Sequence, residues 1–223
     1  DALHADRVAF MHRIGELGTS LIMPAWQERY FGIKTVNIFP GNGARGLPGL
    51  FSTYILYDAT SGAPLALIDG NEITSRRTAA ASALAARFLA RPDAERLLIV
   101  GSGRVASLLA EAYQAVLPLR EIAVWSRNRA SAVALSASLN ARGFNSNAWN
   151  DLEAAVRQAD IVSCATLSTA PLIRGEWLPA GSHLDLIGGF TPHMVEADDA
   201  CFTNARIFVD TDEALLKAGD LLG

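Results

Sequence analysis

Two different patterns of apolar residues follow one another along the chain. Up to about residue 69, strand-like segments succeed each other with only turn residues between them. From residue 97 onward, short unbroken apolar runs alternate with longer segments that have helical spacing. The first pattern predicts an antiparallel sheet, and the second predicts a parallel sheet with helices between its strands.

The first pattern predicts five strands and a glycine-rich connection. A hairpin-like turn at 15–18 separates the first two strands, and a turn of small and polar residues at 58–64 precedes the last one. The loop from Gly41 to Gly49 lacks the Gly-Lys-Ser/Thr ending of a phosphate-binding loop, so we interpret it as a mobile connection. The predicted strands are 7–11, 19–23, 30–40, 51–57 and 65–69.

A long alanine-rich helix follows, ending near Ala90 before Pro92. Its candidate capping residues are Asn71, Thr74 and Ser75. Arg76 and Arg77 then fall in its first turns, where the helix dipole favours acids. Two arginines there would form an anion site, and the alternative is a solvated pair of surface arginines.

The strongest single motif begins with the apolar run Leu97–Val100. The run enters Gly-x-Gly-x-x-Ala and then an apolar helix from Ala106 to about Val116, which is the order of a dinucleotide-binding fingerprint. Gly101 permits the tight turn, Gly103 admits a pyrophosphate, and Ala106 keeps the helix close to the strand. The helix N-terminus favours phosphate. The cofactor-binding residues predicted here are Gly101, Ser102, Gly103, Arg104, Val105 and Ala106.

Strands and helices continue to alternate after this motif, which predicts an α/β fold with a Rossmann-type, doubly wound parallel sheet. The segment before this motif, with its antiparallel strands up to about residue 69, is expected to form a second, smaller α+β domain. Further strands are predicted at 122–125, 161–164, 184–187 and 207–209, and helices at 130–142, at 152–158 and from about residue 213.

The end of the second predicted parallel strand bears on the choice of cofactor. NAD-specific enzymes usually place Asp or Glu here, whereas this chain has Ser126, Arg127, Asn128 and Arg129. A guanidinium can bind a 2′-phosphate through two donors, which favours NADPH, with NADH as the alternative. The other interpretation is that two exposed arginines simply open a helix.

Composition excludes several classes of protein. The 223 residues are 50% hydrophobic and 19% charged, with a net charge of −4 and no basic tract, which argues against nucleic acid as a partner. No apolar run is long enough for a membrane span and no signal peptide begins the chain. Cys164 and Cys201 form no disulfide framework, which fits the cytoplasm. We expect pieces to be missing from both ends.

These motifs together resemble the ornithine cyclodeaminase/mu-crystallin family. The resemblance spans nearly the whole chain in the family's order, and the Arg-Arg-Thr-Ala-Ala helix start is its most specific part. The resemblance implies a substrate and dimerisation domain at 1–72, a connecting helix at 73–91, an NAD(P)-binding domain at 92–217, and the start of a returning tail at 218–223. The motifs that carry it are 22–26, 33–36, 67–70, 76–80, 101–103, 125–128, 166–171 and 218–220.

Site roles follow from the resemblance. Lys34 looks like the active-site lysine, although an edge-strand lysine with a solvated head is the alternative. Arg77 looks like the arginine that binds a substrate carboxylate, and Arg7 like a second one. The implied cofactor contacts are Thr78, Thr166, Leu167, Ser168 and Ile187, the implied substrate-pocket residues are Met23 and Phe190, and no metal is expected.

One departure from the family pattern decides between reactions. Ornithine cyclodeaminases carry Asp directly after the Gly-Gly of the fourth strand, where this chain has Phe190, which cannot transfer protons. The resemblance therefore favours the branch that reduces Δ1-pyrroline-2-carboxylate or Δ1-piperideine-2-carboxylate to proline or pipecolate, acting as a homodimer. The alternatives are an amino-acid dehydrogenase such as alanine dehydrogenase, a cyclodeaminase, and a non-catalytic NADPH-dependent binder of small molecules.

Overall fold

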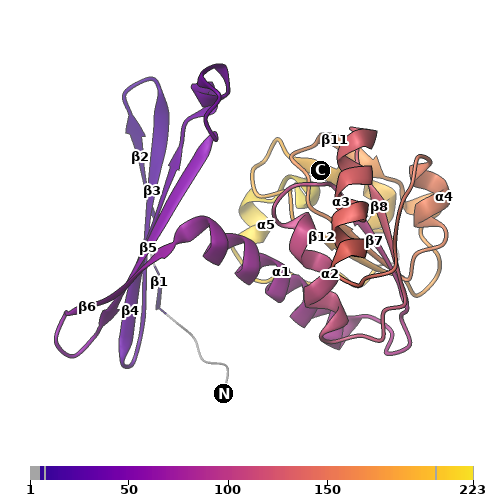
Figure 1. The fold of residues 1–223 in the computed structure, drawn as a ribbon, viewed down its shortest axis with the longest axis horizontal. Helices are drawn as coiled ribbons and strands as arrows, with labels where there is room; N and C mark the ends of the chain where they lie inside the picture. Colours follow the sequence, from indigo (N-terminus) through magenta and orange to yellow (C-terminus); the bar gives the residue numbers. More distant parts are fainter. Residues whose placement is uncertain (1–5, 8, 204, 223) are drawn as a thin grey trace. The chain divides into compact units, whose positions relative to one another are not determined.

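The chain forms two units, which are described separately. A computed structural model describes residues 6–7, 9–203 and 205–222. The units are Asp1–Ser75 and Arg76–Gly223, and Figure 1 shows their elements in chain order. No helix among the described residues has the length and apolar character that a membrane span requires.

The first unit is one antiparallel sheet, as predicted. Its strand order is β1-β3-β4-β5-β6, and β2 also pairs with β3. The hairpin predicted at the start of the chain is confirmed, because β2 and β3 pair around the turn that contains Gly15. The strands are β1 (Asp6–Arg7), β2 (Phe10–Ile14), β3 (Gly18–Gln27), β4 (Tyr30–Ile38), β5 (Leu50–Asp58) and β6 (Pro64–Asp69).

The structure excludes one alternative for this unit and adds one element to it. Lys34 is not on an edge strand, because β4 pairs with β3 on one side and β5 on the other. The glycine-rich connection is not wholly irregular, because Pro40–Arg45 forms the 3-10 helix η1. Its proline stands at the first position, where the fixed φ suits a helix start.

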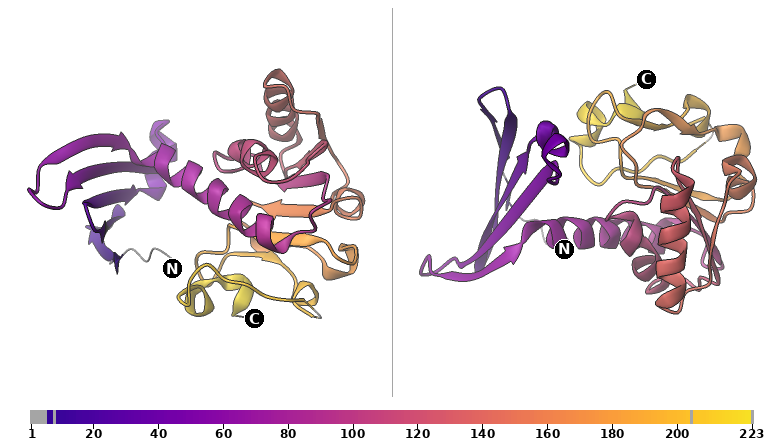
Figure 2. Two further views of the ribbon diagram at one scale, coloured as in Figure 1. Left: turned by 90° about the horizontal axis from the view of Figure 1, so that it is seen from below. Right: turned by 45° about the horizontal axis from the view of Figure 1, so that its top comes forward.

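Helix α1 (Gly70–Leu89) begins earlier than the predicted caps. The Asp69 carboxylate accepts the backbone N–H groups of Asn71 at 2.7 Å and Glu72 at 3.3 Å, so Asp69 caps the helix. Thr74 lies inside the helix, and Arg77 is the eighth helical residue. The dipole argument for an anion site at the arginines is therefore wrong, because the dipole acts within the first turn. Figure 2 shows α1 as one continuous helix.

The second unit is built on a parallel sheet with the order β12-β10-β7-β8-β9. The fifth strand is β9, which the sequence did not reveal, and 207–209 is not a strand. Ile207 and Phe208 are half exposed, and an apolar run becomes a strand only where a neighbour supplies hydrogen bonds. The strands are β7 (Arg96–Val100), β8 (Glu121–Trp125), β9 (Ser146–Ala148), β10 (Ile161–Cys164) and β12 (His183–Leu186).

Both faces of this sheet are covered, which confirms the doubly wound α/β prediction. Leu97 and Ile99 pack into one cluster with α1, α2 and α3, while Leu98 and Val100 pack into another on the opposite face. All four are at most 1% exposed. The remaining helices are α2 (Ala106–Gln114), α3 (Arg129–Ala141), α4 (Leu152–Val156), α5 (Ala214–Lys217) and the short η4 (Gly219–Leu221).

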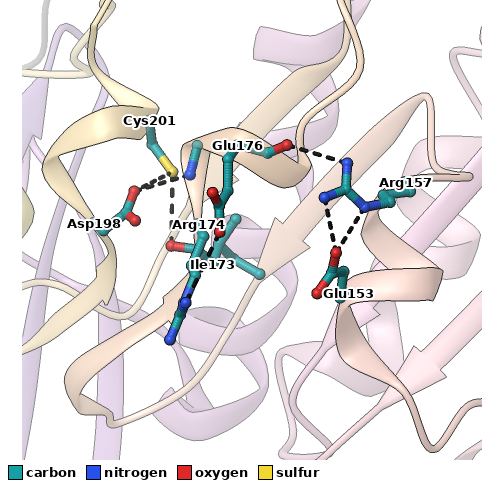
Figure 3. A network of polar contacts seen from close by, with 8 residues as sticks. Glu153, Arg157, Ile173, Arg174, Glu176, Asp198 and Cys201 are labelled. Carbon is teal, nitrogen blue, oxygen red and sulfur yellow. Dashed lines mark hydrogen bonds and ion pairs between the residues drawn. The ribbon is translucent and has the colours of Figure 1, made fainter.

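The second face is completed by a small parallel pair, β11 (Thr169–Ile173) with β13 (Val195–Ala197), flanked by η2 (Gly175–Trp177) and η3 (Asp199–Cys201). Figure 3 shows the polar contacts that hold this region. Cys201 Sγ donates to Ile173 O at 3.7 Å and to Asp198 Oδ1 at 3.4 Å. Arg157 donates to Glu176 O at 3.1 Å. These contacts fasten loops to one another and form part of the fold.

Candidate functional site

The predicted cofactor residues of the second unit lie at one edge of its sheet. Gly101 follows β7, Ser126 follows β8, Thr166 follows β10 and Ile187 follows β12. All of these strands are parallel, so their carboxyl ends lie at the same edge. The chain runs from β7 through β8 to β9, then crosses to β10, which makes the β7–β10 boundary a topological switch point. Open α/β sheets bind ligands in the crevice at such a point.

Gly101 fits its predicted role. Its φ is +121°, a conformation that side chains disfavour, and a Cβ there would lie 2.6 Å from the carbonyl oxygen of Ala165. The glycine therefore lets the ends of β7 and β10 come close together. Gly103 has open space where a Cβ would stand, so a ligand can approach this backbone.

The turn then leads into α2 with an open N-terminus. Val105, at the N-cap position, makes no side-chain cap bond, and the first turn carries no acid. Arg104 is exposed, whereas Ala106 is fully buried against the sheet. The N–H groups of Ser107 and Leu108 donate to the carbonyl oxygens of Gly103 and Val105. A helix start with no side-chain cap and no negative charge suits an anion. This turn fits the pyrophosphate of a dinucleotide.

The end of β8 carries a serine that is hydrogen-bonded to the turn after β7, and next to it an exposed arginine. Ser102 Oγ donates to Ser126 Oγ at 3.2 Å, which joins the ends of β7 and β8. Arg127 is exposed. The side chain of Asn128 caps α3 by accepting the N–H of Ser131 at 3.4 Å. The described geometry therefore gives Asn128 a structural task, while a cofactor contact for it stays a prediction.

The loop after β10 is held by a carboxylate that the sequence reasoning missed. Glu196 accepts the backbone N–H and the hydroxyl of Thr166, both at 2.7 Å, and the N–H of Gly188 at 2.6 Å. Burial raises the pKa of Glu196, an effect that these hydrogen bonds partly offset. An acid between Val195 and Ala197 was the available signal, since a charge in apolar surroundings needs partners.

The rest of this loop divides by exposure. Ser168 is buried and donates its hydroxyl to Ala170 O at 2.7 Å, while Leu167 is 68% exposed. Ile187 is half-buried and donates its N–H to Cys164 O. Phe190 is 61% exposed beyond the Gly-Gly pair. Both apolar side chains, Leu167 and Phe190, can therefore meet a ligand at this edge.

Lys34 lies at the centre of the first unit's sheet. Its Nζ donates to Thr74 Oγ1 at the start of α1 over 3.4 Å. Met23 stands opposite it on β3, and Tyr54 stands opposite it on β5. Directly opposed residues share a face, so Met23, Lys34 and Tyr54 form one row. The structure thus brings two predicted substrate-site residues together, with Tyr54 as an unpredicted neighbour.

Arg77 and Arg7 are the arginines predicted to bind a substrate carboxylate. Arg77 is exposed on α1, and the half-buried Thr78 follows it. The backbone of Arg7 pairs with Ala25, and its side chain lies outside the described residues. Arg77 and Thr78 belong to the second unit, whereas Lys34 and Arg7 belong to the first. Their roles stay predictions.

Both cysteines are buried. Cys164 is fully buried in β10, as predicted, and burial raises its pKa well above the ordinary value. Burial also raises the pKa of the Cys201 thiol to about 12. Thiols that stay protonated are poor nucleophiles and poor metal ligands.

A parallel sheet with a glycine turn at its switch point defines an NAD(P)-binding class of protein. The chain belongs to the ornithine cyclodeaminase/mu-crystallin family, whose profile matches residues 4–222. A Δ1-pyrroline-2-carboxylate reductase from Paracoccus denitrificans is 45% identical over 208 residues, covering 92% of this chain and 66% of that protein. The chain thus spans just under two thirds of that relative's length.

Solved structures agree with this assignment. The Δ1-pyrroline-2-carboxylate reductase of Thermococcus litoralis, in complex with NADH and L-proline, has a TM-score of 0.89 and 28% identity. The match covers 98% of this chain and 69% of that one. An archaeal alanine dehydrogenase dimer with bound NAD has the same TM-score and 31% identity, covering 97% of this chain and 67% of that one.

Proposed function

We propose that this protein catalyses the NAD(P)H-dependent reduction of a cyclic ketimine carboxylate. The substrates would be Δ1-pyrroline-2-carboxylate, giving L-proline, and Δ1-piperideine-2-carboxylate, giving L-pipecolate. The observation that carries this proposal is the Gly188-Gly189-Phe190 sequence at the carboxyl end of β12, which offers no carboxylate to an amino substrate. Relatives named as reductases of the five-membered imine support it.

In this mechanism the nicotinamide supplies a hydride to C2 of the imine when the cofactor is bound. Gly101 and the start of α2 would hold the pyrophosphate, and Arg127 would bind the 2′-phosphate that distinguishes NADPH. The carbon of the C=N bond gains the hydride and the nitrogen holds a proton, so the product is a secondary amine.

The protein's own groups would orient the substrate and control its proton. Arg77, with Arg7, would bind the carboxylate and fix which face of C2 is presented. Lys34 would either bind the carboxylate or deliver a proton through water. Phe190 would form an apolar wall near the ring. We also propose a cytoplasmic homodimer, in keeping with the dimer of the alanine dehydrogenase relative.

Steady-state kinetics on the full-length protein test this proposal. We expect oxidation of NADPH, and more weakly of NADH, with each of the two cyclic imines. No turnover of either imine would contradict it. Pyruvate with ammonia as the preferred substrates would instead indicate an alanine dehydrogenase, an activity that a structural relative carries by name. Tight NADPH binding without any imine reduction would indicate a non-catalytic binder.

A further inference from the structure

A buried carboxylate, that of Glu196, contacts the ends of β10 and β12 at the edge of the sheet where the predicted cofactor contacts lie. Glu196 is 0% exposed, and among the described residues it is the one charged side chain in the buried class. A carboxylate loses its hydration there, so hydrogen bonds from the protein have to offset the free-energy cost of its burial. It receives three, from the N–H and hydroxyl of Thr166 and from the N–H of Gly188.

The donors come from two neighbouring strand ends. Thr166 follows β10 by two residues, and Gly188 follows β12 by two residues. β10 and β12 pair directly in the parallel sheet. One buried side chain therefore holds together the two loops that carry Thr166, Leu167, Ser168 and Ile187, which are the predicted cofactor contacts on this side of the switch point.

The two glycines that follow β12, Gly188 and Gly189, fit closely around this carboxylate. A Cβ on Gly188 would lie 2.1 Å from Thr166 O and 2.6 Å from Glu196 Oε1. A Cβ on Gly189 would lie 2.1 Å from Asp220 Oδ2. The Gly-Gly pair therefore lets the backbone after β12 approach both Thr166 and two acidic side chains.

Asp220 supports Glu196 from the other side. Asp220 Oδ1 accepts the backbone N–H groups of Glu196 at 2.7 Å and Ala197 at 3.0 Å. The strand that carries Glu196 is thus fixed to the short helix η4, which contains Asp220. The backbone of Glu196 is thus bonded to Asp220, and its carboxylate is bonded to Thr166 and Gly188. Protein groups alone hold this carboxylate in place.

We propose that Glu196 is a positioning residue for the cofactor: it sets the spacing between the ends of β10 and β12, and so the shape of the crevice that receives the nicotinamide half. It acts through Thr166 and Gly188 and does not itself touch the cofactor. Sites need their contact residues held by supporting hydrogen bonds. This inference rests on the proposed NAD(P)H-dependent function.

Glu196→Gln tests it, with Asp160→Asn as the matched control. Gln keeps the size of Glu but has one acceptor oxygen, so one donor in Thr166 or Gly188 loses its partner. Asp160 likewise accepts two backbone N–H groups, those of Glu95 and Arg96, both at 3.0 Å, but at the amino edge of the same sheet. Loss of a purely structural carboxylate would lower the melting temperature in both variants.

Cofactor titration of the full-length proteins separates a role in positioning the cofactor site from a purely structural role. For Glu196→Gln we expect the dissociation constants of NADH and NADPH to rise about tenfold. We also expect the KM for cofactor to rise more than kcat falls. Asp160→Asn should bind both cofactors within about twofold of the unaltered protein. Gly188→Ala, whose methyl group would push Thr166 away, should weaken binding with the carboxylate still present, and it decides the question if Glu196→Gln does not fold.

Folded Glu196→Gln or Gly188→Ala protein that binds both cofactors as the unaltered protein does would overturn this inference alone. An equal loss of binding in Asp160→Asn would also overturn it, because position at the crevice would then not matter. If the unaltered protein binds neither NADH nor NADPH, the proposed function fails and this inference fails with it.

Discussion

The two sheets of this chain obtain their stability in different ways. In the parallel sheet, Leu97, Leu98, Ile99 and Val100 alternate between two apolar clusters and are almost completely buried. In the antiparallel sheet, no apolar side chain of the described residues falls in the buried class, and Leu67 is 73% exposed. The parallel sheet is covered by its own helices and loops, whereas within the described residues the apolar side chains of the antiparallel sheet stay partly exposed.

The difference matters for function because the two units contribute different chemistry. The parallel sheet offers a pre-formed turn and helix start for a nucleotide. The antiparallel sheet offers a cation, Lys34, in its interior strand and close to Thr74. Under the proposed function, the second unit would bind the nucleotide and the first would present the substrate-binding face, and variants in each unit test its part.

The largest expected effect is on stability, and it tests the comparison of the two sheets. Ile99→Ala should lower the free energy of unfolding by about 3 kcal/mol, because it leaves a cavity between packed layers. Ile68→Ala removes the same atoms from a side chain that is already 37% exposed, so we expect about 1 kcal/mol. Urea unfolding of both full-length variants measures this. An equal cost would contradict the comparison, because Ile68 would then be as well packed as Ile99.

The next effect is on catalysis, and it tests whether both units contribute to it. Lys34→Ala and Arg77→Ala should each lower kcat/KM for the cyclic imine at least 100-fold, roughly 2.7 kcal/mol of barrier, because each removes a charge that would orient the substrate in the proposed mechanism. Steady-state assays measure this at saturating NADPH. Lys217→Ala, at the chain's other lysine, and Arg87→Ala, farther along α1, are the controls and should stay within threefold. Activity retained in Lys34→Ala would confine the chemistry to the second unit.

Sequence reasoning worked best where one chain segment determines the structure. The apolar run before Gly101 and the helix after it predicted the nucleotide turn, because strand, turn and helix are contiguous. It failed where a distant partner decides. Among the described residues, the run at 207–209 has the composition of a strand but pairs with no other strand. The start of α1 is a local feature that was also missed, since Asp69 directly precedes the helix and caps it. Glu196 escaped notice because its donors lie 30 and 8 residues away in sequence.

The smallest expected effect is on the pKa of Asp58. This carboxylate accepts backbone N–H groups, as Glu196 does, but it is more exposed to solvent. Burial raises the pKa of Glu196, while hydrogen bonds lower the pKa of the partly exposed Asp58. For Asp58 the backbone N–H of Ser61 contributes most, at 2.8 Å, followed by its hydroxyl at 2.9 Å. Hydrogen bonds to the ionised form thus dominate where water is present, and desolvation dominates where it is not.

Ser61→Ala should therefore move the pKa of Asp58 upward toward its ordinary value of 3.8 without reaching it, because the N–H groups of Thr60 and residue 61 remain as donors. The turn's contribution to stability is present above the ordinary pKa and is lost as the pH falls through the lowered one. Side-chain NMR titration of Asp58 measures the midpoint, with Ser131→Ala, in the other unit, as the control that leaves it unchanged. A midpoint at 3.8 in the unaltered protein would mean that the turn between β5 and β6 is not held by this carboxylate.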